Sequence, residues 1–187
     1  MSLMDRAEQA LSRHFEAACG TGAPPQLVQA MRHAVFPGGA RIRPQLCMAV
    51  AVACGDDHPA LTDAAAVALE FMHCASLVHD DMPAFDDAST RRGRPTVHAA
   101  YGEPLALLAG DALIVMAYRA LQQGSGRQFE RLALLMDNLT SGVGLPAGIV
   151  AGQAWECEPS ADLSQYQRAK TGALFVSATC AGAISAG

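Results

Sequence analysis

Residues 64–81 read AAAVALEFMHCASLVHDD and are the strongest indication of the fold in this sequence. It contains no glycine or proline, it is rich in alanine and leucine, which favour helices, and it ends in two adjacent acids. Thr62 is suited to cap the first turn, and Pro83 closes the helix because proline lacks a backbone N–H. The sequence therefore predicts one long helix, almost wholly apolar until its acidic end.

The composition extends this prediction to the whole chain. Among 187 residues, 51% are hydrophobic, only 17% are charged and 37 are alanine, and the net charge is −5. A disordered tail needs the opposite balance, and a nucleic-acid surface needs a basic face, so both classes are excluded. Because strands prefer aromatic and β-branched residues, we predict a single all-α domain over residues 1–187.

Apolar residues at helical spacing, bounded by proline or glycine, predict the other helices. They cover residues 3–20, 25–36, 44–54, 104–123, 127–139, 146–158 and 163 to the chain end. Residues 83–95 are polar and charged and are expected to form a loop, and no segment has a strand-like period of useful length.

Six cysteines are scattered without a CxxC pair, and no basic-then-apolar signal precedes them. They are expected to be reduced, mostly buried thiols of a cytoplasmic protein. The longest late uncharged stretch, residues 171–187, is too short and polar to cross a bilayer, so no membrane span is predicted.

The acids at the end of the long helix are the first candidate site. Asp80 and Asp81 are adjacent and repel each other, which a divalent cation with oxygen ligands would relieve. The stop at Pro83 allows the chain to fold back, so that Asp86 could join Asp80 at one ion. A solvated loop or a cap for the next helix is the alternative, but Arg91 and Arg92 follow, and arginine suits phosphate oxygens. We therefore predict a metal–diphosphate site.

Several segments together resemble a known family. They are GGARIRP at residues 38–44, MHCASLVHDD at 72–81, DDMPAFD at 80–86 followed by STRRG, LAGDAL at 108–113, GQAWE at 152–156 and KTGALF at 170–175. DDMPAFD resembles the first aspartate-rich motif of the trans-prenyltransferases, the short-chain polyprenyl diphosphate synthases. The sequences of these segments are most similar to those of proteobacterial geranylgeranyl diphosphate synthases of pigment (carotenoid) pathways. The resemblance implies an isoprenoid-synthase-type helical bundle with a central cavity.

The resemblance also implies a reaction, the Mg²⁺-dependent head-to-tail condensation of isopentenyl diphosphate with an allylic diphosphate. Each motif residue then has an expected role. Asp80, Asp81 and Asp86 bind Mg²⁺; Arg91, Lys170 and Thr171 hold the allylic diphosphate; Arg43, His73 and Arg92 hold isopentenyl diphosphate; Gln153 lines the cavity; and Ala75 and Ser76 set the depth available to the prenyl tail. Geranylgeranyl diphosphate is the expected product because Ala75 and Ser76 are small, and a homodimer is expected from the family.

Some residues keep other interpretations. Without the motif, His73 would be a buried histidine satisfied by a hydrogen bond, and His79 is expected to be only a helix-terminal residue. Asp111 is expected either to support Lys170 or an arginine, or to make a structural hydrogen bond. Ala40 stands where the family usually has lysine, which weakens the isopentenyl diphosphate site unless Arg41 substitutes.

Alternatives to the synthase remain. Family members continue with a second aspartate-rich motif, and none follows Lys170, so we expect the chain to be the N-terminal two-thirds of a family-length protein, with its C-terminal helices missing and little activity alone. A farnesyl diphosphate synthase and a non-catalytic subunit are the nearest alternatives. An HD-type phosphohydrolase using His73, His79 and Asp80 would leave the arginines and Lys170 without roles.

Overall fold

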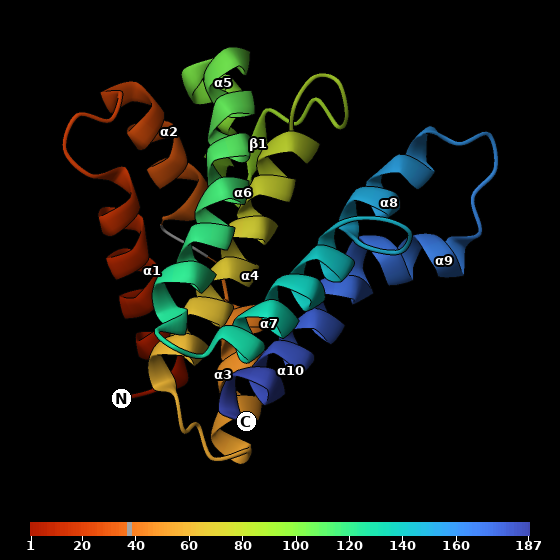
Figure 1. The fold of residues 1–187 in the computed structure, drawn as a ribbon. Helices are drawn as coiled ribbons and strands as arrows, with labels where there is room; N and C mark the ends of the chain where they lie inside the picture. Colours follow the sequence, from red (N-terminus) through yellow and green to blue (C-terminus); the bar gives the residue numbers. More distant parts are fainter. Residues whose placement is uncertain (37–38) are drawn as a thin grey trace.

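The computed structural model describes residues 1–36 and 39–187 and consists almost entirely of helices (Figure 1). The long helices α4 (Pro59–Asp80) and α6 (Glu103–Ser125) pack against each other through the middle of the molecule. α1 (Leu3–Cys19) and α2 (Pro25–Val35) lie on one side of this pair. α3 (Ile42–Ala53), α7 (Phe129–Val143) and α10 (Ala173–Ala186) pack together beside it. The predicted all-α class is confirmed.

Helix α4 is the core helix that its sequence predicts. Its side chains are buried on nearly every face from Leu61 to Met72, and they include many alanines, which allow neighbouring helices to approach closely. By length and composition, α4 and α6 could each cross a membrane, but 78% of the apolar window of α4 is buried inside the protein. A core helix passes the same test, so the absence of a membrane span stays a prediction.

Several predicted helix boundaries are wrong, and the helix predicted from Pro146 begins only at Ile149. α4 begins at Pro59, and Thr62 is not its cap but lies inside the helix, where its hydroxyl donates to Asp56 Oδ1 at 2.7 Å. Proline is favoured in the first turn because it has no N–H to leave unsatisfied, and Pro59 therefore provides the stronger start signal. For the same reason α3 includes Pro44 in its first turn and begins at Ile42, while α7 continues beyond residue 139 to Val143.

The acidic loop ends in a short hairpin that was not predicted. β1 (Thr90–Arg91) pairs with β2 (Arg94–Pro95), and the two turn residues between them have positive φ angles. Arg94 ties the hairpin to α2, because its guanidinium donates to the Phe36 carbonyl at 3.1 Å and to His33 Nδ1 at 3.1 Å. The short helix α5 (Val97–Tyr101), also not predicted, follows and packs on α2 and α6.

The C-terminal part forms an arm that projects from the helical bundle (Figure 1). It contains α8 (Ile149–Ala154), the 3-10 turn η1 (Trp155–Cys157) and α9 (Leu163–Gln167). The π-helical turn η2 (Arg168–Gly172) joins α9 to α10, so the helix predicted from residue 163 onward is continuous but widened at this turn. Such widened turns often occur at functional sites.

The cysteines only partly match their prediction. All six are free, and burial raises the pKa of Cys47 and of Cys74 to about 12. Cys54, Cys157 and Cys180 are exposed, however, so the thiols are not mostly buried.

Candidate active site

The end of α4 and the loop after it fold back as Pro83 suggested. The Asp86 amide donates to the Asp80 carbonyl at 3.0 Å, and the Ala88 amide donates to the Asp81 carbonyl at 3.1 Å. These backbone bonds satisfy orphan carbonyls at the helix end and return Asp86 to the side of Asp80. The local chain geometry therefore brings two of the three predicted metal ligands together.

A third carboxylate, Glu156, comes from η1 in the C-terminal arm and lies close to these two. One ligand oxygen from each of Asp80, Asp86 and Glu156 lies within 4.8 Å of the others. Mg²⁺ in proteins commonly takes one or two carboxylates together with substrate phosphates, so Asp80 and Asp86 fit the ion that the motif implies, while Glu156 is occupied by Lys170. Glu156 was not among the predicted site residues. The GQAWE segment that carries it was the only sequence signal.

Lys170 lies between the carboxylates of Glu156 and Asp80. Its ammonium nitrogen is 2.6 Å from Glu156 Oε1 and 3.3 Å from Asp80 Oδ1. Partial burial lowers the pKa of Lys170, but the hydrogen bond to Glu156 and the charges of both carboxylates outweigh burial, and the pKa is raised above its usual range. Lys170 is therefore a fixed cation facing the acidic group.

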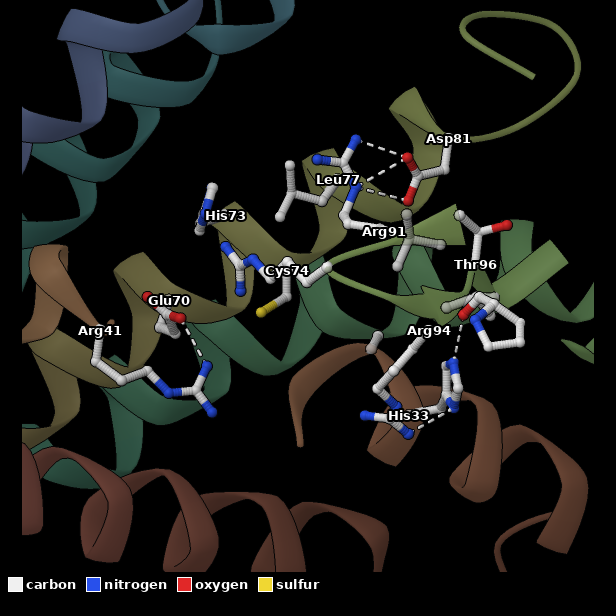
Figure 2. Close-up of a pocket in the computed structure, with 15 residues that line it drawn as sticks. His33, Arg41, Glu70, His73, Cys74, Leu77, Asp81, Arg91, Arg94 and Thr96 are labelled. Carbon is white, nitrogen blue, oxygen red and sulfur yellow. Dashed lines mark hydrogen bonds and ion pairs between the residues drawn. The ribbon is translucent and has the colours of Figure 1, made fainter. Parts of the chain in front are cut away.

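Asp81 points away from that group, toward the hairpin. Its carboxylate accepts from Arg91 Nε at 2.8 Å and from a terminal nitrogen of Arg91 at 2.6 Å (Figure 2). This hydrogen bonding to Asp81 raises the pKa of Arg91. The same guanidinium lies 3.7 Å from Asp80. The structure thus places Asp81 as the anchor of Arg91 and does not bring it into the three-carboxylate group.

A basic pocket opens beside the carboxylates, between α2, α4 and the hairpin (Figure 2). His73 lines it together with Arg41, Arg91, Arg92 and Arg94. Burial and then the surrounding arginines, Arg43 foremost, lower the pKa of His73 to about 3. His73 is therefore a neutral imidazole among cations, in a pocket suited to an anion.

Arg43 and Arg92 meet close to this pocket. The Arg43 guanidinium lies over the Phe175 ring at 4.6 Å, and its Nε is buried without a hydrogen-bond partner among the described residues. Burial lowers the pKa of Arg43, and the charge of Arg92 lowers it further. A side-chain carbon at Gly39 would fall 2.3 Å from a terminal nitrogen of Arg92, so the guanidinium packs directly on the glycine backbone. Gly38, the other glycine of the predicted motif, is outside the described residues.

Arg41 does not replace the lysine that Ala40 lacks. Its donors are used by Glu8 at 2.8 Å, by Glu70 at 2.7 Å and by the Val35 carbonyl at 2.7 Å. With 3% exposure it is a structural cation that joins α1, α2 and α4, so the condition under which Arg41 would compensate for Ala40 is not met.

Other predicted residues are more dispersed. Gln153 donates to Glu156 Oε2 at 2.6 Å, while Thr171 follows Lys170 in the π-helical turn and is exposed. Asp111 does not support Lys170. It is exposed on α6, where its ion-pair partner among the described residues is His79 at 3.9 Å. His79 is the penultimate residue of α4, as expected.

The histidines also decide against a phosphohydrolase. His73 lines the basic pocket, whereas His79 packs on Gly110 of α6, so the two imidazoles face different sides of α4. The possible metal-binding group among the described residues contains three carboxylates and no histidine.

The two proposed depth residues lie on different faces of α4. Ala75 is 1% exposed within the core, and Ser76 is half-buried one turn before Asp80, its hydroxyl donating to the His73 carbonyl at 2.8 Å. Ser76 therefore shares the face of Asp80, as its spacing predicts.

Comparisons with known proteins identify the family of the chain. The family model described as polyprenyl synthetase matches residues 24–187. The chain is 56% identical to a geranylgeranyl diphosphate synthase of Cereibacter sphaeroides and 54% identical to one of Rhodobacter capsulatus, each time over the whole chain and 65% of the relative. An apo crystal structure of an FPP/GFPP synthase from Zymomonas mobilis matches with a TM-score of 0.85 and 36% identity, over 98% of this chain and 69% of the other. The chain thus spans about two-thirds of these relatives, and the predicted helical fold and resemblance are confirmed: it belongs to the polyprenyl synthetase family.

Proposed function

We propose that the protein carrying this chain is a Mg²⁺-dependent short-chain prenyl diphosphate synthase, which condenses isopentenyl diphosphate with an allylic diphosphate to give geranylgeranyl diphosphate. The observation that carries the proposal is the pairing of a three-carboxylate group with an adjacent arginine-rich pocket. One diphosphate needs metal ions as counter-charges and the other can be held by arginines, so the two neighbouring sites suit two diphosphate substrates.

In this proposal the carboxylates and Lys170 hold the allylic substrate. Asp80 and Asp86 provide oxygen ligands for Mg²⁺, which neutralises the diphosphate leaving group and favours ionisation to an allylic cation. Lys170 reaches the same diphosphate from the opposite wall, with Thr171 beside it. Arg91, held by Asp81 and 3.7 Å from Asp80, contacts it from the hairpin side.

In this proposal isopentenyl diphosphate is held by Arg92 and His73, which line the basic pocket, together with Arg43 nearby. A neutral His73 can donate one hydrogen bond, while the arginines supply the charge. Fixing the two substrates side by side makes the attack of the double bond on the allylic cation effectively intramolecular, which is worth several kcal/mol of the barrier. The cation that this attack leaves then loses a proton to the released diphosphate, which completes the product.

The product assignment follows the relatives. The two proteins at 54–56% identity are named geranylgeranyl diphosphate synthases, whereas the FPP/GFPP synthase is only 36% identical. A cytoplasmic location and a role in carotenoid biosynthesis belong to the same proposal.

A homodimer is part of the proposal, with α6 as the contact. Leu108 and Val115 lie on one face of α6 and are 50% and 66% exposed. Single exposed leucines are normal, but an apolar row along one helix favours a partner surface. Sedimentation velocity is expected to show a dimer, and Val115→Arg should shift it to monomer. A monomeric wild type would refute this contact.

Calorimetry with an inert allylic thio-diphosphate tests the proposed site. Binding should require Mg²⁺, disappear with EDTA and be lost in Asp80→Ala, while the control Asp137→Ala, an exposed acid on α7, should bind normally. Product chromatography on purified protein carrying this chain then tests the reaction. Metal-independent binding, or normal binding by Asp80→Ala, would contradict the proposal.

A further inference from the structure

We infer that Glu156 is a positioning residue that holds the ammonium of Lys170 ready for the allylic diphosphate. The inference rests on the proposed function and adds to it a residue that the sequence did not single out. Lys170 is the only lysine among the 187 residues, every other cationic side chain being arginine or histidine. Within this chain Lys170 is therefore the one flexible ammonium at the site, and what fixes it matters.

Glu156 is the centre of a small hydrogen-bond network. One oxygen accepts from Lys170 at 2.6 Å and from the Tyr166 hydroxyl at 2.5 Å, and the other accepts from Gln153 Nε2 at 2.6 Å. A carboxylate held by two further donors cannot rotate freely, so it fixes the direction of the lysine as well as its charge.

The backbone is built to bring these side chains together. A side-chain carbon at Gly152 would lie 2.2 Å from the Lys170 amide nitrogen and 2.5 Å from its Cα, so α8 and the π-helical turn pack backbone to backbone. Only glycine allows this approach. The close contact places η1, which carries Glu156, beside the turn that carries Lys170.

The two contacts of Lys170 differ in a way that suits substrate capture. The bond to Glu156 is short, whereas the distance to Asp80 is 3.3 Å. An arriving diphosphate can replace the long contact to Asp80, which frees that carboxylate for its metal, while the contact to Glu156 remains. A lysine side chain loses rotamer entropy when it is fixed, and a lysine fixed in advance spares the substrate this cost.

The first test observes the ammonium of Lys170 directly. In protein carrying this chain and labelled with ¹³C,¹⁵N-lysine, the Cε–Nζ correlation that disappears in Lys170→Arg belongs to Lys170, and it is expected to show slow exchange of the ammonium protons. Glu156→Gln should move this signal to the position of a solvated lysine and speed the exchange, and Glu156→Asp should restore part of the shift. Glu158→Gln, an exposed acid two residues away, is the matched control and should leave the signal unchanged.

The second test measures binding of the allylic thio-diphosphate with Mg²⁺ by calorimetry. Glu156→Gln should weaken binding about tenfold, which corresponds to ~1.4 kcal/mol. Glu156→Asp should recover part of this affinity, and Glu158→Gln should bind as the wild type does. Because Glu156 is at the surface, all variants should melt within a few degrees of wild type. If the wild type binds and Glu156→Gln binds equally well, or if the lysine signal does not move in Glu156→Gln, the inference is overturned but the proposed function is not. If the wild type does not bind the allylic thio-diphosphate, the proposed function is overturned.

Discussion

At the level of single residues, the neutral imidazole of His73 makes stability depend on pH. Its pKa is about 3 in the folded chain, against an ordinary value of 6.5, because of burial and the nearby arginines. Between these values the unfolded chain binds a proton that the folded chain does not, so His73 favours folding fully above pH 6.5 and the contribution is lost as the pH falls toward 3.

The variant His73→Gln should remove this dependence. Between pH 6 and 4 the free energy of unfolding of the wild type is expected to fall by about 1 kcal/mol more per pH unit than that of the variant. This is somewhat below the limit of ~1.4 kcal/mol per pH unit for one proton, because the side chain is only partly buried. Urea unfolding at pH 7, 6, 5 and 4 measures it. Parallel pH curves for the two proteins would show that His73 is not held neutral.

Gly39 offers a second test of a single residue, because its missing side chain makes room for Arg92. Gly39→Ala would push away only the far end of a flexible arginine, so stability should change little while the guanidinium moves. Isopentenyl diphosphate should then bind about tenfold more weakly by calorimetry, ~1.4 kcal/mol, with binding of the allylic thio-diphosphate unchanged. Ala40→Ser, an exposed neighbour, is the control. Equal loss for both ligands would contradict a role confined to Arg92.

The part of the site that sequence predicts is the local part. Asp80 and Asp86 are six residues apart, and the proline between them forces the return that joins them. Glu156 is far along the chain, and only the packing of Gly152 on the turn of Lys170 brings it to the same place. The structural roles of Arg41 and Asp81 were missed for the same reason: their partners, Glu70 and Arg91, come from other segments.

At the level of elements, helix packing depends on glycine at the contact of α10 with α3. A side-chain carbon at Gly182 would lie 2.3 Å from the Cys47 carbonyl oxygen and 2.8 Å from Val50 Cβ. Because one neighbour is backbone, α10 must shift, and Gly182→Ala should cost about 1–3 kcal/mol, lowering the melting midpoint by several degrees.

Gly172, on the same helical run, is the matched control. It has helical φ and ψ angles, and an added carbon would meet its nearest neighbour only at 3.9 Å. Alanine there should be neutral or stabilise by up to ~1 kcal/mol through helix propensity. Similar melting midpoints for Gly182→Ala and Gly172→Ala would contradict the tight α10–α3 contact.

Helix existence follows from sequence more readily than helix ends. Each predicted helix is present because its apolar residues repeat at helical spacing between glycine and proline. Errors arise where two start signals compete, as at Pro59 and Thr62, or where a five-residue element such as α5 is too short to show a period. The two-residue strands of the hairpin are likewise fixed by turn geometry at Arg92 and Gly93.

At the level of the whole molecule, the side chains along α4 beneath the carboxylates would set the length of the product in the proposed reaction. In that reaction the prenyl tail would run from the metal site along α4, so side chains about one turn before Asp80, ~5.4 Å along the axis, would limit its length. Ser76 shares the face of Asp80 and is half-buried, and Ala75 adjoins it in the core. Both are small, which leaves depth for the longer geranylgeranyl chain.

Enlarging either residue should therefore shorten the product. Protein carrying Ala75→Tyr or Ser76→Phe should make mainly farnesyl diphosphate, while the wild type makes mainly geranylgeranyl diphosphate, as measured by chromatography of dephosphorylated products. Ala75 is 1% exposed, so its tyrosine variant needs a melting curve as a folding control, whereas half-buried Ser76 can accept a ring with less strain. Ser76→Thr, nearly unchanged in reach, should keep the wild-type product. A wild type that stops at farnesyl diphosphate, or a folded Ser76→Phe that still makes geranylgeranyl diphosphate, would show that another part of the molecule sets the chain length.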